Sequence, residues 1–267
     1  MTTKAERIQQ KKQHFQELME FDAEYRRNAK YIAGVDEVGR GPLAGPVVSA
    51  AVVLPGDFDV FEINDSKKLS DKKRRELDQE IRRQALAYGF GMRDNRRIDE
   101  VNILNATKEA MGDAVRAAAA MLRSRMQGGA EAPQPVNPQM PVLSSGQNMD
   151  DPMLVAAQEA AEDAAEEAAG FSPVGMVLID AVHLEELEEA GIPQDSPVKG
   201  DFRSASVAAA SIIAKVRRDD MMIAFSREYP GYAFEKNKGY GTREHYEGLR
   251  AHGLTPIHRR TFLKNFL

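Results

Sequence analysis

Residues 34–48 place two adjacent acids, Asp36 and Glu37, one residue before a Gly-Arg-Gly turn. Apolar residues flank this segment on both sides, at 31–33 and at 47–54. The pattern predicts a strand, a tight turn and a second strand. An acid at the end of a buried strand is costly to desolvate unless it is paired or binds a cation, and glycines let the backbone approach a ligand closely. The segment therefore favours a metal ion acting on a phosphodiester.

Composition narrows the class of protein. The 267 residues are 42% hydrophobic, which is typical of a soluble globular protein of one or two domains. The absence of cysteine excludes disulfides, thiolate nucleophiles and cysteine zinc sites, and it fits a reducing cytosol. The first residues are polar and lack the apolar core of a signal peptide, and no apolar run reaches membrane-spanning length. We expect a cytoplasmic protein with no membrane contact.

The net charge of −5 is unevenly distributed. Acids gather at 150–167 and 185–189, whereas basic clusters occur at 67–68, 72–75, 93–97, 217–218, 236–238 and 258–260. A basic face on an acidic protein would suit a nucleic acid. The alternative is that these clusters are ordinary solvated helix faces.

Helical and strand-like stretches alternate along the chain. We expect a charged helical arm over residues 1–30, without chemistry of its own, and a strand at 85–93. Ser70 is a good N-cap for a helix that starts at Asp71. A further helix is predicted over 98–126. The residues available to face the protein core from this helix are Ile103, Leu104, Ala110, Met111, Ala114 and Leu122.

Composition then breaks at an insertion. Residues 127–151 are rich in Gly, Pro, Gln, Asn and Ser and are predicted to be disordered, and 152–170 form an alanine- and glutamate-rich helical stretch. A buried strand at 174–180 and a long helix at 204–229 follow, the helix with a face of small residues. Short helices and turns complete the tail. The alternation predicts an α/β architecture.

Three acids stand where such elements end or begin. Asp36 and Asp180 each follow an apolar run, and Asp201 precedes the helix at 204. Carboxylates placed in this way can converge on one cleft and suit magnesium, and two such ions can stabilise both the attacking and the leaving oxygen of a phosphodiester. Glu37 can join them only if the backbone leaves strand geometry or its longer side chain reaches round. For each acid the alternative role is an N-cap or a surface salt bridge.

Several motifs, in this order, resemble bacterial ribonuclease HII. They lie at residues 36–47, 65–69, 179–180, 199–201, 206–219 and 239–242, followed by His245. The resemblance covers roughly 31–267 without the insertion. It implies a ribonuclease H-like fold, with a central mixed sheet flanked by helices and a C-terminal helical segment. The domains it implies are an arm at 1–30, a catalytic domain at 31–222 interrupted by 127–170, and a substrate-binding segment at 223–267.

The same resemblance implies an activity. Ribonuclease HII hydrolyses the RNA strand of RNA/DNA hybrids and incises 5′ to single ribonucleotides in duplex DNA, leaving 3′-hydroxyl and 5′-phosphate ends. Carried over by motif, the catalytic acids are Asp36, Glu37, Asp180 and Asp201, which would bind magnesium or manganese in a two-metal site. Hybrid and ribonucleotide-containing duplex would be the partners. Apart from the resemblance, a monomer is our default expectation.

Substrate recognition is also implied. The turn Gly39, Arg40 and Gly41 would sense the 2′-hydroxyl, which distinguishes RNA from DNA, largely through backbone groups. Tyr240 would stack on the sugar 3′ of the ribonucleotide. The phosphate-contact candidates are Ser66, Lys67 and Lys199.

Two other functions stay open. One is a nucleic-acid-binding protein with a dead site, whose acids hold a structural cation. The other is the hybrid-specific type HIII ribonuclease, which usually carries an N-terminal substrate-binding domain.

The compact form of the family generally lacks the insertion at 127–170. The acidity of this insertion would weaken DNA binding if it lay near the cleft.

Overall fold

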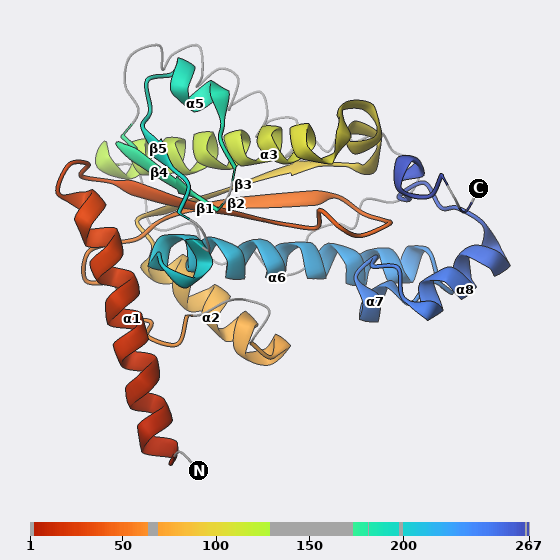
Figure 1. Cartoon of the computed structure of the whole chain (residues 1–267), viewed down its shortest axis with the longest axis horizontal. Helices are drawn as coiled ribbons and strands as arrows, with labels where there is room; N and C mark the ends of the chain where they lie inside the picture. The colour runs from red at the N-terminus through yellow and green to blue at the C-terminus, as the bar shows by residue number, and fades with distance from the viewer. Residues whose placement is uncertain are drawn as a thin grey trace.

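Five strands form one mixed sheet in the order β3-β2-β1-β4-β5 (Figure 1). The structure, a computed structural model, describes residues 3–63, 69–128, 173–180, 182–197, 200–264 and 266, and for Asp201 the backbone only. The strands are β1 Ile32–Val38, β2 Val47–Val53, β3 Ala87–Arg93, β4 Met176–Ile179 and β5 Gln194–Asp195. β1, β2 and β3 pair antiparallel, whereas β4 is parallel to β1 and β5 to β4. The predicted hairpin and mixed sheet are confirmed.

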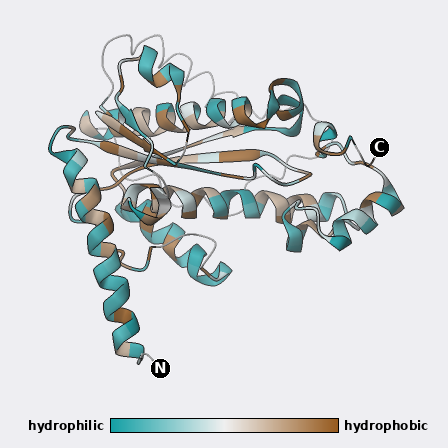
Figure 2. Cartoon of the chain, in the orientation of Figure 1, coloured by the Kyte–Doolittle hydropathy of each residue, from teal (hydrophilic) through white to brown (hydrophobic). Residues whose placement is uncertain are grey.

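Helices cover both faces of the sheet (Figure 1). α3 Asn95–Met126 and α5 Glu185–Glu189 lie on one face, and α6 Ala205–Glu228 and α2 Asp71–Gln84 lie on the other. Alternate residues of β2 enter the two cores, because successive side chains on a strand point to opposite faces. This explains why β2 is apolar throughout; Figure 2 shows the hydrophobic residues gathered in the strands between more polar helices.

The N-terminal helix α1 Lys4–Arg26 docks through its second half. Phe15 and Leu18 are buried against the sheet core, whereas Ile8 is exposed. Asp22 is fully buried and accepts a hydrogen bond from the Ser206 amide at 3.0 Å and another from its hydroxyl. A carboxylate at a helix N-terminus satisfies free amides and complements the helix dipole. A helix is thus present in the predicted N-terminal arm, and its second half is tied to the start of α6.

Helix starts were predicted more accurately than helix faces. Ser70 caps α2, accepting from the Lys73 amide at 3.3 Å, and α2 begins at Asp71 as expected. The core-facing role predicted for Leu104 is wrong, because this side chain is 43% exposed. Asn102 interrupts α3 with a φ of 71° and restarts the helix by accepting hydrogen bonds from the Leu104 and Asn105 amides. The turn resets the helical phase, so a single periodic pattern fails across it.

The C-terminal segment builds a third core beyond the sheet. α7 Phe234–Asn237, α8 Arg243–His252 and the short helix η3 Arg260–Phe262 follow α6. Their apolar residues enclose Ala44 from the β1–β2 connection and Met222 from α6. The predicted insertion, residues 127–170, lies outside the described residues from 129 onward. No helix in the described parts of the chain is long and apolar enough to span a membrane.

Gly34 sets the separation between β1 and α6. A Cβ atom at this position would lie 2.1 Å from the Ser206 carbonyl carbon and 2.2 Å from the Val207 nitrogen, both backbone atoms that cannot move aside. We expect Gly34→Ala to lower the free energy of unfolding by at least about 2 kcal/mol, measured by urea denaturation. Gly56→Ala is the matched control, since a Cβ there meets nothing within 4 Å, and it should change stability by less than about 1 kcal/mol. Equal effects of the two substitutions would contradict this packing.

Candidate active site

Asp36 and Asp180 lie side by side at the edge where β1 and β4 run parallel. Val35 of β1 pairs with Ile179 of β4. The residues that follow them, Asp36 and Asp180, are therefore neighbours across the two segments. Asp36 does not end its strand as the sequence analysis expected, because β1 continues to Val38 with Asp36 opposite Ala50. Asp180 does follow the last residue of β4. The predicted approach of these two acids is found in the structure.

Burial and like charge act together on Asp36. Its pKa is raised well above the usual value, first by burial, then by the charges of Glu37 and Asp180. A hydrogen bond from the Ser211 hydroxyl on α6 opposes this and favours the charged carboxylate. None of the described residues supplies a counter-charge to Asp36, which is the condition that a bound cation relieves.

Glu37 keeps regular strand geometry, opposite Ser49. Its Cβ therefore points to the other face from that of Asp36, and the predicted departure of the backbone does not occur. The carboxylate is still close enough for Asp180 to raise its pKa, although burial is the larger cause and Arg40 opposes it. The Arg40 guanidinium lies 3.4 Å from the carboxylate. Because the backbone keeps its strand geometry, Glu37 can join the other acids only through the reach of its longer side chain.

Asp201 is placed by its backbone in the short helix η2 Gly200–Phe202. The amide of the preceding residue, Gly200, donates to Asp180 Oδ1 at 3.1 Å, which ties η2 to the end of β4. Among the described side chains no three acids or histidines stand close enough to make a complete metal site. The oxygen donors of Asp36, Glu37 and Asp180 nonetheless fit a divalent cation such as Mg²⁺ or Mn²⁺.

The Gly-Arg-Gly turn lies directly beside Tyr240. A Cβ built on Gly41 would be 3.6 Å from Tyr240 Cε1, and the Leu43 amide donates to the Gly239 carbonyl at 2.8 Å. Tyr240 is 44% exposed, which is unusual for a large aromatic residue here. Segments about 200 residues apart are thus brought together next to Glu37, as the resemblance implied. The candidates Ser66, Lys67 and Lys199 lie outside the described residues.

Two histidines, His245 and His258, form a hydrogen-bonded chain that ends at the Tyr240 carbonyl. The Thr255 amide donates to His258 Nδ1 at 2.8 Å, so His258 carries its proton on Nε2 and donates to His245 Nε2 at 3.0 Å. His245 Nδ1 then donates to the Tyr240 carbonyl at 2.9 Å. The hydrogen bonds define one neutral tautomer for each ring. Protonation of either ring would set two N–H groups against each other.

Several residues of the site have no clear sequence signal. Ser211 was noted only as part of a small-residue face, yet its hydroxyl bonds Asp36. Arg218 and Arg259 belong to the clusters 217–218 and 258–260, for which the alternatives were a basic face or ordinary solvated helix faces. Both side chains are fully buried, so neither alternative holds for them. A sequence pattern does not reveal such burial, because arginines are mostly exposed.

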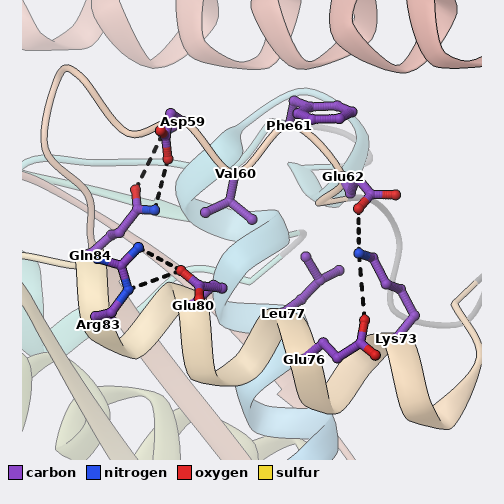
Figure 3. Close-up of a pocket in the computed structure, with 10 residues that line it drawn as sticks. All are labelled: Asp59, Val60, Phe61, Glu62, Lys73, Glu76, Leu77, Glu80, Arg83 and Gln84. Atoms are coloured by element: carbon purple, nitrogen blue, oxygen red, sulfur yellow. Dashed lines mark hydrogen bonds and ion pairs between the residues drawn. The ribbon is translucent and has the colours of Figure 1, made fainter.

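A hollow of about 390 Å³ lies between residues 59–62 and α2 (Figure 3). Its charged groups are already paired: Glu62 with Lys73, Glu80 with Arg83, and Asp59 with Gln84. None of the candidate site residues lines it. The hollow is therefore separate from the acids of β1 and β4.

Comparison with known proteins agrees with the geometry. A family model described as ribonuclease HII matches residues 33–142 and 151–265. A ribonuclease HII of Ligilactobacillus salivarius is 43% identical over 257 residues, 96% of this chain and 79% of the relative. A ribonuclease HII of Enterococcus faecalis is 43% identical over 251 residues, 94% of this chain and 76% of the relative.

A solved structure shows the same fold. Ribonuclease HII of Archaeoglobus fulgidus, in complex with PCNA, superposes with a TM-score of 0.52 at 22% identity, covering 86% of this chain and 93% of that one. At this identity the likeness concerns the fold, a mixed sheet flanked by helices.

The histidine pair predicts a pH dependence of stability. Burial, followed by the neighbouring His245, lowers the pKa of His258 to about 4. The His258 side chain therefore takes up a proton near pH 6.5 in the unfolded chain but only near pH 4 in the native chain. Its contribution to the free energy of unfolding is fully present above about pH 6.5 and is lost as the pH falls toward 4. We expect wild type to lose roughly 2–4 kcal/mol more than His258→Asn over this range, measured by urea denaturation. His252→Asn, at an exposed histidine, should behave as wild type; parallel curves for wild type and His258→Asn would contradict the assignment.

Proposed function

The chain belongs to the ribonuclease HII family and is a ribonuclease H, and we propose that it cuts both RNA/DNA hybrids and duplex DNA that contains a single ribonucleotide. In the second substrate the cut falls on the 5′ side of the ribonucleotide and leaves 3′-hydroxyl and 5′-phosphate ends. The observation that carries the proposal is the position of Asp36 in β1 and of Asp180 directly after β4, beside the Gly-Arg-Gly turn and Tyr240.

Four acids would hold the divalent cations: Asp36, Glu37, Asp180 and Asp201. When bound, two such ions stabilise charge on the attacking and the leaving oxygen of the phosphodiester. The protein groups orient these ligands. Ser211 favours the charged form of Asp36, and the Gly200 amide fixes Asp180 and brings η2 to the same edge. Because the proton competes with the cation at Asp36, whose pKa is raised, metal affinity falls as the pH falls.

Recognition of the ribose is assigned to the neighbouring turn and aromatic ring. The backbone of Gly39, Arg40 and Gly41 reads the 2′-hydroxyl, the group that separates RNA from DNA. Tyr240 is exposed beside Gly41 and stacks on the following sugar, which favours an RNA-to-DNA junction. The exposed ring of Tyr240 is what favours this reading over a hybrid-specific enzyme.

Removal of one carboxylate charge tests the catalytic assignment. We expect Asp36→Asn to lower the rate of incision at least ~100-fold, because it removes several kcal/mol of charge stabilisation at about 1.4 kcal/mol per tenfold. The substrate is an end-labelled DNA duplex with one ribonucleotide, in Mg²⁺ or Mn²⁺.

Duplex affinity and the urea midpoint should stay close to those of wild type, because binding depends mainly on phosphate contacts. Retained turnover by a folded Asp36→Asn protein would refute the assignment. Wild type that binds duplex without cutting any substrate would instead support a dead-site binding protein.

Truncation of the exposed ring tests junction reading. Tyr240→Ala should reduce incision at a single ribonucleotide by about 10-fold or more, since stacking on an aromatic ring contributes roughly 1–3 kcal/mol. Cleavage of a continuous hybrid should change less, because it presents no junction. Ile8→Ala is the control, because it removes a similarly exposed apolar side chain from the first half of α1. If both substrates were affected equally by Tyr240→Ala, Tyr240 would have no role at the junction.

A further inference from the structure

Two arginines are fully buried next to the candidate site. Arg218 on α6 and Arg259 near the C-terminus each have 0% of their surface exposed. Neither forms an ion pair with any carboxylate that the structure describes. Burial of an uncompensated charge is costly, so each guanidinium needs a full set of hydrogen-bond acceptors.

Backbone carbonyls supply these acceptors. Arg259 donates to the carbonyls of Gly39 at 2.6 Å, Arg40 at 3.0 Å and Gly45 at 2.8 and 2.9 Å. Every one of them belongs to the connection between β1 and β2. The planar fork of a guanidinium can span several fixed acceptors, which an ammonium cannot do.

Arg218 completes the set from the other side. It donates to the carbonyls of Pro46 at 2.9 Å, Ala44 at 3.1 Å and Lys238 at 2.9 Å. The last carbonyl lies two residues before Tyr240. A single buried side chain thus joins the turn to the loop that carries the exposed ring.

The turn is shaped to fit these cations. Gly39 has a φ of 98°, and a Cβ there would lie 2.2 Å from Arg218 Nε. Only glycine allows both this backbone conformation and this approach. The Gly45 amide also donates to the Ile257 carbonyl, and the Arg259 amide to the Leu43 carbonyl, each at 2.9 Å. The C-terminal segment therefore fixes the turn along its length.

When Arg259 binds the carbonyl of a peptide group, it also fixes the direction of the N–H in the same peptide group. In a trans peptide the C=O and the following N–H point in opposite directions, and the described chain has no cis peptide. The Gly39 and Arg40 carbonyls point toward Arg259, so the amides of Arg40 and Gly41 point away from it. These two amides donate no hydrogen bond to any described residue. A buried positive charge at the carbonyl end also polarises each peptide group and strengthens its N–H as a donor.

We infer that Arg218 and Arg259 are positioning residues for ribose recognition, which hold the turn so that the amides of Arg40 and Gly41 face the 2′-hydroxyl region beside Tyr240. The inference rests on the proposed function, because it assigns a cause to the selectivity of that same site. The two arginines act through the turn and do not touch the substrate.

The test compares two substrates under metal-saturated, steady-state conditions: a DNA duplex with one ribonucleotide and a continuous RNA/DNA hybrid. Arg259→Lys and Arg218→Lys keep a positive charge but lose the fork. Their matched controls are Arg260→Lys and Arg227→Lys, at exposed neighbours on the same segments. Circular dichroism and thermal melting establish the folded fraction of each protein at the assay temperature.

For Arg259→Lys we expect kcat on the single-ribonucleotide duplex to fall about 10- to 100-fold, the effect of a small displacement of a positioning group. KM should remain close to wild type, since phosphate contacts that bind the duplex lie elsewhere. The loss on the hybrid should be smaller, because overlapping registers each offer a 2′-hydroxyl. Arg218→Lys should show the same split, and the controls should keep the wild-type ratio of the two rates.

Equal losses on both substrates, or unchanged rates in a folded Arg259→Lys protein, would overturn the inference. Wild type that fails to cut the single-ribonucleotide duplex would instead overturn the proposed function.

Backbone order parameters of the wild-type protein give a test that needs no variant. Values near 0.85 at Arg40 and Gly41, as in the strands, are expected for a held turn, and values below about 0.6 would contradict it.

Discussion

The close packing of α6 against β1 is the contact on which the rest of the site depends. Gly34 lets the start of the helix approach the strand backbone, and a side chain there would overlap Ser206. From that position α6 presents Ser211 to Asp36 and Arg218 to the turn, and it extends to Met222 in the C-terminal core. The helix is thus a common frame for the acids, the turn and the tail. A shift of α6 would disturb all three together.

Buried charge is arranged in two opposite ways within this frame. Burial and the charges of neighbouring acids raise the pKa of Asp36 and of Glu37, and none of the described residues forms an ion pair with Asp36. A short distance away, Arg218 and Arg259 are short of negative charge and are satisfied by backbone carbonyls. The first arrangement favours the binding of a cation, whereas the second holds a loop by hydrogen bonds. In the proposed function, catalysis and recognition are assigned to separate groups, so substitutions can test them separately.

Much of this organisation was predictable because it follows from local rules. The cap at Ser70, the hairpin, and the acids Asp36 and Asp180 after apolar runs were all identified from sequence and agree with the structure. What failed depends on contacts distant in sequence or on one unusual backbone angle. Leu104 is exposed because Asn102 turns the helix at a φ of 71°. Arg218 and Arg259 were counted as surface charge because their acceptors lie about 170 and 220 residues away.

The most direct measurement of the central claim is the position of the cut in a DNA duplex with one ribonucleotide. Both strand ends are labelled, and the products are mapped with and without Mg²⁺ or Mn²⁺. The account predicts a single, metal-dependent incision on the 5′ side of the ribonucleotide, with a 3′-hydroxyl on the upstream fragment. A cut on the 3′ side, or cleavage restricted to continuous hybrids, would contradict the roles given to the Gly-Arg-Gly turn and Tyr240.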